Sequence, residues 1–370
     1  MKKSLLLLLC LVPLLCGCGS LYAQRREVEH LLVMETMGLD FAPGGVMLSL
    51  ASADGGSAGG AVCCSAAGAS IADAQERLQR SSLEEELFCG HLQHLLLGED
   101  YARQGLDGFL ATVCRSPDLR LDLPVYLILD GTAQEAMASA GDGSRSVSDL
   151  LSALEQGRDG ARFSTAGAIL RDLDRQGGAL VRTLRLRRAS EEGEEELLTL
   201  TPEGYGVLVD GRLQEKIGPE EAVAVELLTD TLRPTPLVLT DGAGRSVTVE
   251  LQESVLRLEP LWEQGQLRGL DVTVQVRAAV LEIEGFPQAA DERYRIALTA
   301  RMETELSRRI GGVLRLSRSM GVDFLGLGSR IERLSPLRGR GMDGGLGPLL
   351  PELTISVTVQ GELAHSNDIY

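Results

Sequence analysis

The chain of 370 residues is poor in aromatic residues, lysine and histidine, and these scarcities limit the classes of protein to which it could belong. Aromatic residues make up 4% of it, with a single Trp, which disfavours the aromatic-lined cleft of a solute-binding protein. Three Lys and one Asn stand against 33 Arg, a bias that a GC-rich genome explains. The formal net charge of −17 disfavours nucleic acid and anionic lipid surfaces as partners, because both would repel it.

The patterns of common catalytic and metal sites are also missing. The sequence contains no HExxH zinc motif and no phosphate-binding GxxxxGK[ST] loop. His91 and His94 have a metal-like spacing only on a helix. They fall on a predicted strand, where residues three apart face opposite ways. We therefore expect no enzyme activity, no cofactor and no metal site, and we favour a binding or assembly role.

The one long apolar run lies at the N-terminus. Lys2 and Lys3 precede the run over 5–15, and Leu15-Cys16-Gly17-Cys18 has the order of a bacterial lipobox. A bilayer-spanning helix needs about 20 residues, so this shorter run predicts a targeting segment that is removed. We expect a signal peptide over 1–17 and lipidation of Cys18, which would hold the protein on the outer face of a membrane. An ordinary secretory signal or an uncleaved anchor is the alternative.

Four further cysteines stand at positions 63, 64, 89 and 114. An exported location permits disulfides, but spacing alone does not assign the pairs. We expect buried free thiols, with a Cys89–Cys114 disulfide as the alternative.

Apolar periodicity predicts a fold of the α+β class. Helices are predicted over 70–79, 100–113, 164–175, 219–228 and 292–320. A further short helix is predicted to open at a capping box over 132–135. Strands are predicted over 30–40, 46–53, 87–97, 123–129, 179–188, 197–210, 213–217, 237–240, 246–252, 255–261, 270–284 and 353–362. These elements alternate without a βαβ rhythm, which predicts largely antiparallel sheets. We expect three mixed α/β domains, over 18–185, 186–240 and 241–370.

The predicted helix over 292–320 is the longest element. Its core-facing stripe follows i, i+4 spacing, and Gly311-Gly312 interrupts it. The stripe consists of Tyr294, Leu298, Met302, Leu306, Ile310, Val313 or Leu314, and Ser317. A loop rich in Gly and Arg is expected after Gly321, before the final strand.

Several short motifs, in their order and spacing, resemble one family. They are Arg25-Arg26-Glu27, Met37-Gly38-Leu39-Asp40, Cys89-Gly90-His91-Leu92-Gln93, Leu97-Gly98-Glu99, the segment 115–120, and Gly321-Val322-Asp323-Phe324-Leu325-Gly326-Leu327-Gly328. With the lipobox, they are similar to the Ger(x)C lipoproteins, the C subunits of spore germinant receptors. The chain departs from that pattern at Gly19-Ser20, where the family usually has Trp-Asp.

The resemblance implies a non-catalytic subunit with three mixed α/β domains. It implies assembly with integral membrane A- and B-type receptor subunits at the spore inner membrane, in a complex that senses nutrients and triggers germination. Asp323, Gly326 and Gly328 belong to the sharpest stretch of the resemblance. Asp323 would cap or pin the loop, and both glycines would allow backbone conformations closed to other residues. An interface role for the three residues is the alternative.

The competing hypothesis is an extracytoplasmic solute-binding lipoprotein that delivers a ligand to a transporter. Proteins of that class usually have two lobes of repeated βαβ units around an aromatic-lined cleft. The low aromatic content and the missing βαβ rhythm fit that class poorly. A cell-envelope enzyme is a third and weaker hypothesis.

Overall fold

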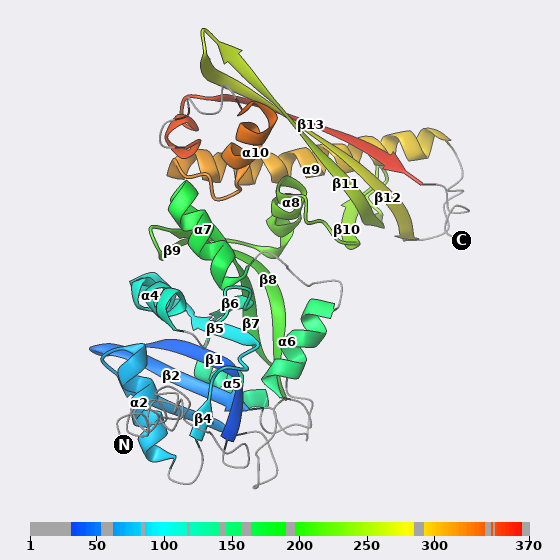
Figure 1. Cartoon of the computed structure of the whole chain (residues 1–370). Coiled ribbons are helices and arrows are strands. Elements are labelled where there is room, and N and C mark those ends of the chain that lie inside the picture. The colour runs from blue at the N-terminus through cyan, green and yellow to red at the C-terminus, as the bar shows by residue number, and fades with distance from the viewer. Residues whose placement is uncertain are drawn as a thin grey trace, which may run out of the picture.

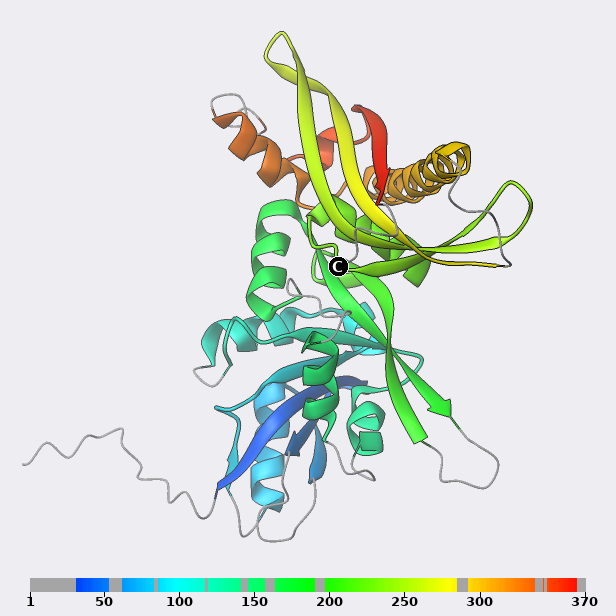
Figure 2. The same cartoon turned by 90° about the vertical axis from the view of Figure 1, so that its right-hand side faces the viewer.

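The structure is a computed structural model that describes residues 31–52, 62–82, 86–116, 119–140, 146–156, 164–189, 197–284, 292–336, 342 and 345–364. These residues form two sheets with helices packed on them (Figures 1 and 2). The predicted mixed α/β class with largely antiparallel sheets is confirmed. The predicted signal peptide over 1–17 and Cys18 lie outside the described residues. Within the described ranges, no helix is both long and apolar enough to cross a membrane.

The first sheet has the strand order β3-β2-β1-β5-β6-β7-β8-β9, with β4 beside β1. Its strands are β1 (Leu31–Ala42), β2 (Gly45–Ser52), β3 (Cys63–Gly68), β4 (Glu86–Phe88), β5 (His94–Gly98), β6 (Val125–Leu129), β7 (Gly178–Ala189), β8 (Leu197–Val209) and β9 (Arg212–Ile217). The central neighbours β1, β5, β6 and β7 run parallel, and antiparallel pairs flank them. The predicted absence of a βαβ rhythm is therefore wrong between β5 and β7, where helices connect parallel strands.

Helices cover both faces of this sheet. One face carries α2 (Ile71–Ser81), α3 (Glu99–Gln104), α4 (Asp107–Arg115) and α7 (Ala166–Gln176), and the other carries α5 (Ala133–Ala140) and α6 (Val147–Gln156). Every residue of β5 and β6 is buried. Parallel strands enclosed on both faces have continuous apolar runs, so their sequences carry no polar alternation that would distinguish an inner from an outer face.

The second sheet has the order β10-β11-β12-β13. Its strands are β10 (Thr235–Thr240), β11 (Ser246–Glu263), β12 (Gln266–Ile283) and β13 (Thr354–Leu363). The helices α9 (Glu292–Met320) and α10 (Leu327–Leu334) pack on one face with the short 3-10 helix Gly347–Leu349. The β11–β12 hairpin projects beyond the helices (Figure 1).

The long predicted helix over 292–320 is confirmed as α9, which runs unbroken through Gly311-Gly312. Its expected stripe is buried, apart from Tyr294, which is half-buried. Predicted boundaries are wrong where the chain bends locally. The 87–97 strand divides into β4 and β5, the 100–113 helix breaks at Gly105 (φ 133°), and the strands 246–252 and 255–261 are one strand, β11. The expected loop after Gly321 contains the helix α10.

The helix α8 (Pro219–Thr229) connects the two sheets. Residues 186–240 contribute β8 and β9 to the first sheet, then α8, and then β10 to the second sheet. The division into domains at 185 and 240 stays a prediction. Six of the eleven residues of α8 are buried, and they point in all directions around its axis. A helix that is apolar all round is stable only when it is enclosed by other elements.

A buried polar cluster ties α8 to the first sheet. The Arg182 guanidinium on β7 donates to the Tyr205 hydroxyl at 2.7 Å and to Glu226 Oε1 on α8 at 3.0 Å. Tyr205 also donates to Glu226 Oε1 at 3.1 Å, and the guanidinium lies 5.0 Å from the centre of the Tyr205 ring. The side chains of Arg182 and Glu226 are 8% and 15% exposed, so neither charge is solvated enough to stand alone.

We predict that Glu226→Met lowers the free energy of unfolding by about 3 kcal/mol, because the charge of Arg182 then stays buried without a partner. The triple variant Arg182→Met, Tyr205→Phe, Glu226→Met should recover most of that loss, since it leaves no polar group unpaired. Urea denaturation measures both. The matched control is Glu76→Met, which breaks an exposed pair with Arg80 and should cost less than about 1 kcal/mol. A triple variant no more stable than Glu226→Met would show that the unpaired charge of Arg182 is not the cause of the loss.

Candidate functional site

The predicted site residues Asp323, Gly326 and Gly328 lie together in the turn between α9 and α10. The Asp323 side chain is buried, and its carboxylate accepts hydrogen bonds from the backbone N–H of Leu327 at 3.0 Å and of Gly328 at 2.7 Å. The first N–H groups of a helix have no partner within the helix, and a carboxylate supplies one. Asp323 therefore caps α10 from inside the protein.

Gly326 is favoured by its backbone conformation, and Gly328, at the start of α10, by close packing. Gly326 precedes α10 with φ +72°, a left-handed conformation that disfavours other residues. A Cβ on Gly328 would lie 2.9 Å from Leu346 Cβ and 3.1 Å from Asp323 Oδ2. The geometry gives all three residues a part in the fold, and an interface role for them stays a proposal.

A second buried carboxylate, which the sequence did not reveal as a cap, repeats this arrangement. Asp40 on β1 accepts hydrogen bonds from the backbone N–H of Ala133 at 2.8 Å and of Gln134 at 2.9 Å, at the start of α5. A Cβ on Gly98 would lie 2.1 Å from Asp40 Oδ1, so the cap requires glycine at the end of β5. The predicted capping box is also present, with reciprocal bonds between Thr132 and Glu135.

Burial governs the ionisation of both caps. Desolvation raises the pKa of Asp323 to about 7, against the opposing effect of its backbone hydrogen bonds. Desolvation likewise raises the pKa of Asp40, and the hydrogen bonds from Ala133 and Gln134 oppose it. Neither carboxylate is placed to transfer a proton to a substrate, because each is enclosed by the backbone that it caps.

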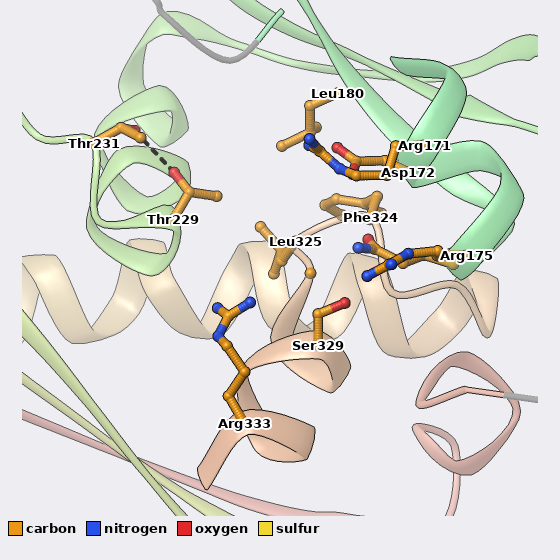
Figure 3. A pocket seen from close by; sticks show the side chains of 12 residues that line it. Arg171, Asp172, Arg175, Leu180, Thr229, Thr231, Phe324, Leu325, Ser329 and Arg333 are labelled. Atoms are coloured by element: carbon orange, nitrogen blue, oxygen red, sulfur yellow. Dashed lines mark hydrogen bonds and ion pairs between the residues drawn. The ribbon is translucent and has the colours of Figure 1, made fainter. Parts of the chain in front are cut away.

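A pocket of about 370 Å³ lies beside the Asp323 turn, between α7, the C-terminal end of α8 and α10. Its lining consists of Arg171, Asp172, Arg175, Gln176, Leu180, Thr229, Thr231, Phe324, Leu325, Gly326, Ser329 and Arg333. Figure 3 shows the side chains of α7 on one side of this space and those of α10 on the other. Gly326 is the predicted site residue that reaches the pocket, and Asp323 positions the helix that forms one wall.

Among the charged groups of the pocket lining, three are arginines and one is a carboxylate. Arg171 donates to Asp172 at 3.0 Å, and Thr229 and Thr231 bond to each other through their hydroxyls at 2.9 Å. Burial raises the pKa of Asp172, although Arg171 beside it favours the charged form. No local pattern in the sequence indicates this pocket, because its arginines come from segments about 160 residues apart in the chain.

The two histidines that the structure describes, His91 and His94, lie in different kinds of local structure. His94 begins β5 and His91 lies in the preceding turn, so the predicted placement of both on one strand is wrong. His94 is buried, with Nδ1 3.2 Å from Ser148 Oγ and Nε2 3.3 Å from Glu155 Oε1. Tyr126 donates to the same Glu155 oxygen at 2.7 Å. Ser148 is itself buried, so this group anchors α6 to the sheet and offers no exposed nucleophile.

Metal ligands and disulfides are also absent from the described part of the chain. Among those residues, no group of three or more His, Cys, Asp or Glu side chains could hold a metal ion. None of Cys63, Cys64, Cys89 and Cys114 forms a disulfide. Cys89 is buried as expected, but Cys64 is half-buried and Cys63 and Cys114 are exposed, so the expectation of burial is wrong for those three. The alternative Cys89–Cys114 disulfide is therefore not formed. The predicted lipidation site, Cys18, lies outside the described ranges.

Two protein-family models match most of the chain. Residues 24–183 match the model described as "Spore germination protein N-terminal domain", and residues 203–367 match "Spore germination B3/ GerAC like, C-terminal". Among solved structures, the chain is similar to the "Crystal Structure of the GerBC protein", with 16% identity over 89% of this chain and 97% of that chain, at a TM-score of 0.57. At this identity the likeness shows a shared fold. The comparison with curated proteins finds no match.

We predict opposite outcomes for one substitution at two glycines. Gly98→Ala should lower the free energy of unfolding by about 1–3 kcal/mol, because the new Cβ displaces the Asp40 carboxylate from its cap. Gly108→Ala, in α4, should be neutral or stabilising, since the nearest atom to its Cβ would be 3.7 Å away and Ala favours the helix. Chemical denaturation compares them. Equal stability of both variants would show that Asp40 is not held against Gly98.

Proposed function

We propose that this chain, which belongs to the Ger(x)C family of spore germination proteins, works as the C subunit of a nutrient germinant receptor. The two family matches carry this proposal, because together they extend from residue 24 to residue 367 with a short gap between them. The shared fold with the GerBC structure, over nearly the whole of that chain, supports it.

In this proposal the subunit has no catalytic activity. The motif residues that first indicated the family, Asp40, Gly98, Asp323 and Gly328, pack and cap helices. Residues used in this way support a stable body whose outer surface contacts partners. The proposed activity is assembly with the integral membrane A- and B-type subunits of the receptor.

We further propose that a lipid on Cys18 holds this subunit at the outer face of the spore inner membrane. The lipobox order at 15–18 supports the anchor. The net charge of −17 also makes a lipid necessary, since an acidic body is not attracted to anionic headgroups. Two or more acyl chains give stable anchoring, whereas one chain binds a membrane only marginally.

We predict that full-length tagged protein, solubilised from spore membranes in mild detergent, co-purifies with a multi-span permease-like protein and a second large membrane protein. Cys18→Ala should abolish this recovery, because the protein is then not delivered to the membrane. Mass spectrometry identifies the recovered proteins, and labelling with palmitate tests the lipid directly.

Cys114→Ala is the matched control, since it removes an exposed free thiol elsewhere in the chain and should leave recovery unchanged. Recovery of transporter components with the wild-type protein would instead support the solute-binding alternative. Recovery of no membrane protein with wild type would contradict the assembly proposal, and equal recovery with Cys18→Ala would contradict the anchor alone.

A further inference from the structure

The pocket beside the Asp323 turn is lined by three arginines and one carboxylate, Asp172, which interacts electrostatically with both Arg171 and Arg175. Several arginines of the described regions have carboxylate partners, such as Arg182 with Glu226 and Arg103 with Glu99. Arg175 and Arg333, on opposite sides of the pocket, have no hydrogen bond or ion pair with any residue of the described ranges. Both side chains are exposed to solvent and line the same cavity.

A third arginine adds to the positive potential next to the pocket. The Arg330 guanidinium donates to the backbone carbonyl of Thr229. Burial lowers the pKa of Arg330, the nearby Asp230 carboxylate opposes this, and the charge of Arg333 adds to the lowering. The single carboxylate in the lining, Asp172, is already paired with Arg171. The space between Arg175 and Arg333 therefore favours a negative charge, and guanidinium groups bind carboxylates through charge-assisted hydrogen bonds.

The rest of the lining limits what such an anion is. Ser329 lies between Arg175 and Arg333 in Figure 3, and its hydroxyl is available to a ligand because no described residue bonds to it. Leu180, Phe324 and Leu325 form an apolar wall next to these polar groups. The volume of about 370 Å³ lies at the lower end of the range for small-molecule sites.

We propose that this pocket binds a small carboxylate that has a short apolar body. The carboxylate lies between Arg175 and Arg333 and accepts from Ser329, and the apolar body packs against Phe324 and Leu325. Because α7 belongs to the first sheet and α10 packs on the second, the ligand contacts both halves of the protein and stabilises the contact between them. The inference rests on the pocket alone and stands apart from the proposed receptor role.

Isothermal titration calorimetry of the full chain with hexanoate tests the proposal. Hexanoate supplies a carboxylate and an apolar chain, and hexanamide is the matched probe without the charge. We expect saturable binding of hexanoate and at least about tenfold weaker binding of hexanamide, because a charge-assisted bond is lost. Arg175→Gln and Arg333→Gln should each weaken hexanoate binding by about tenfold or more.

The control variant is Arg77→Gln, an exposed arginine on α2, which should bind hexanoate as the wild type does. Thermal melts of all three variants should match wild type, since the replaced side chains lie at the surface. Inorganic phosphate, an anion without an apolar body, tests separately whether the site binds any anion or requires the apolar body as well. Phosphate binding as tight as that of hexanoate would overturn the apolar part, and failure of wild type to bind hexanoate, or equal binding by the Arg333→Gln variant, would overturn the site.

Discussion

The enclosure of α8 is the constraint on which the rest of the structure depends. This helix is buried nearly all round, so it is stable only while β8, α9 and β11 surround it. The pair between Arg182 and Glu226 then fixes its position, because each buried charge depends on the other. Through α8 the cores of the two sheets are continuous, and the pocket between α7 and α10 exists because both halves are held against this helix.

Two buried carboxylates give two of the motifs shared with the family a defined part in the fold. Asp40 on β1 caps α5, which is distant in the chain, and Asp323 caps α10, which begins four residues after it. Each carboxylate lies against a glycine, and a side chain at that glycine would displace the carboxylate. Such positions tolerate little change, because a helix end without its cap leaves buried N–H groups unpaired. The motifs therefore identify the fold, and the surface and the pocket are where function is to be sought.

Elements with a strong local signal could be predicted from the sequence. The stripe of α9 and the capping box of α5 were both visible, since each depends on residues close in the chain. The parallel order of β5 and β6 was not visible, because strands buried on both faces show no alternation. A bulge between Leu251 and Glu253 shifts the alternation along β11, which is why this one strand was predicted as two. The helix α10 was missed because it is short. The pocket arginines meet only after both sheets have packed.

Hydrogen exchange of the full chain, measured by mass spectrometry, tests most directly whether α8 joins the two halves into one body. Amides within α8 should exchange as slowly as those of β5, since both would then open only when the whole protein unfolds. Faster exchange in α8 than in β5 would show that the halves separate before they unfold. That result would contradict a shared core and would remove the basis for a pocket held at a fixed width between α7 and α10.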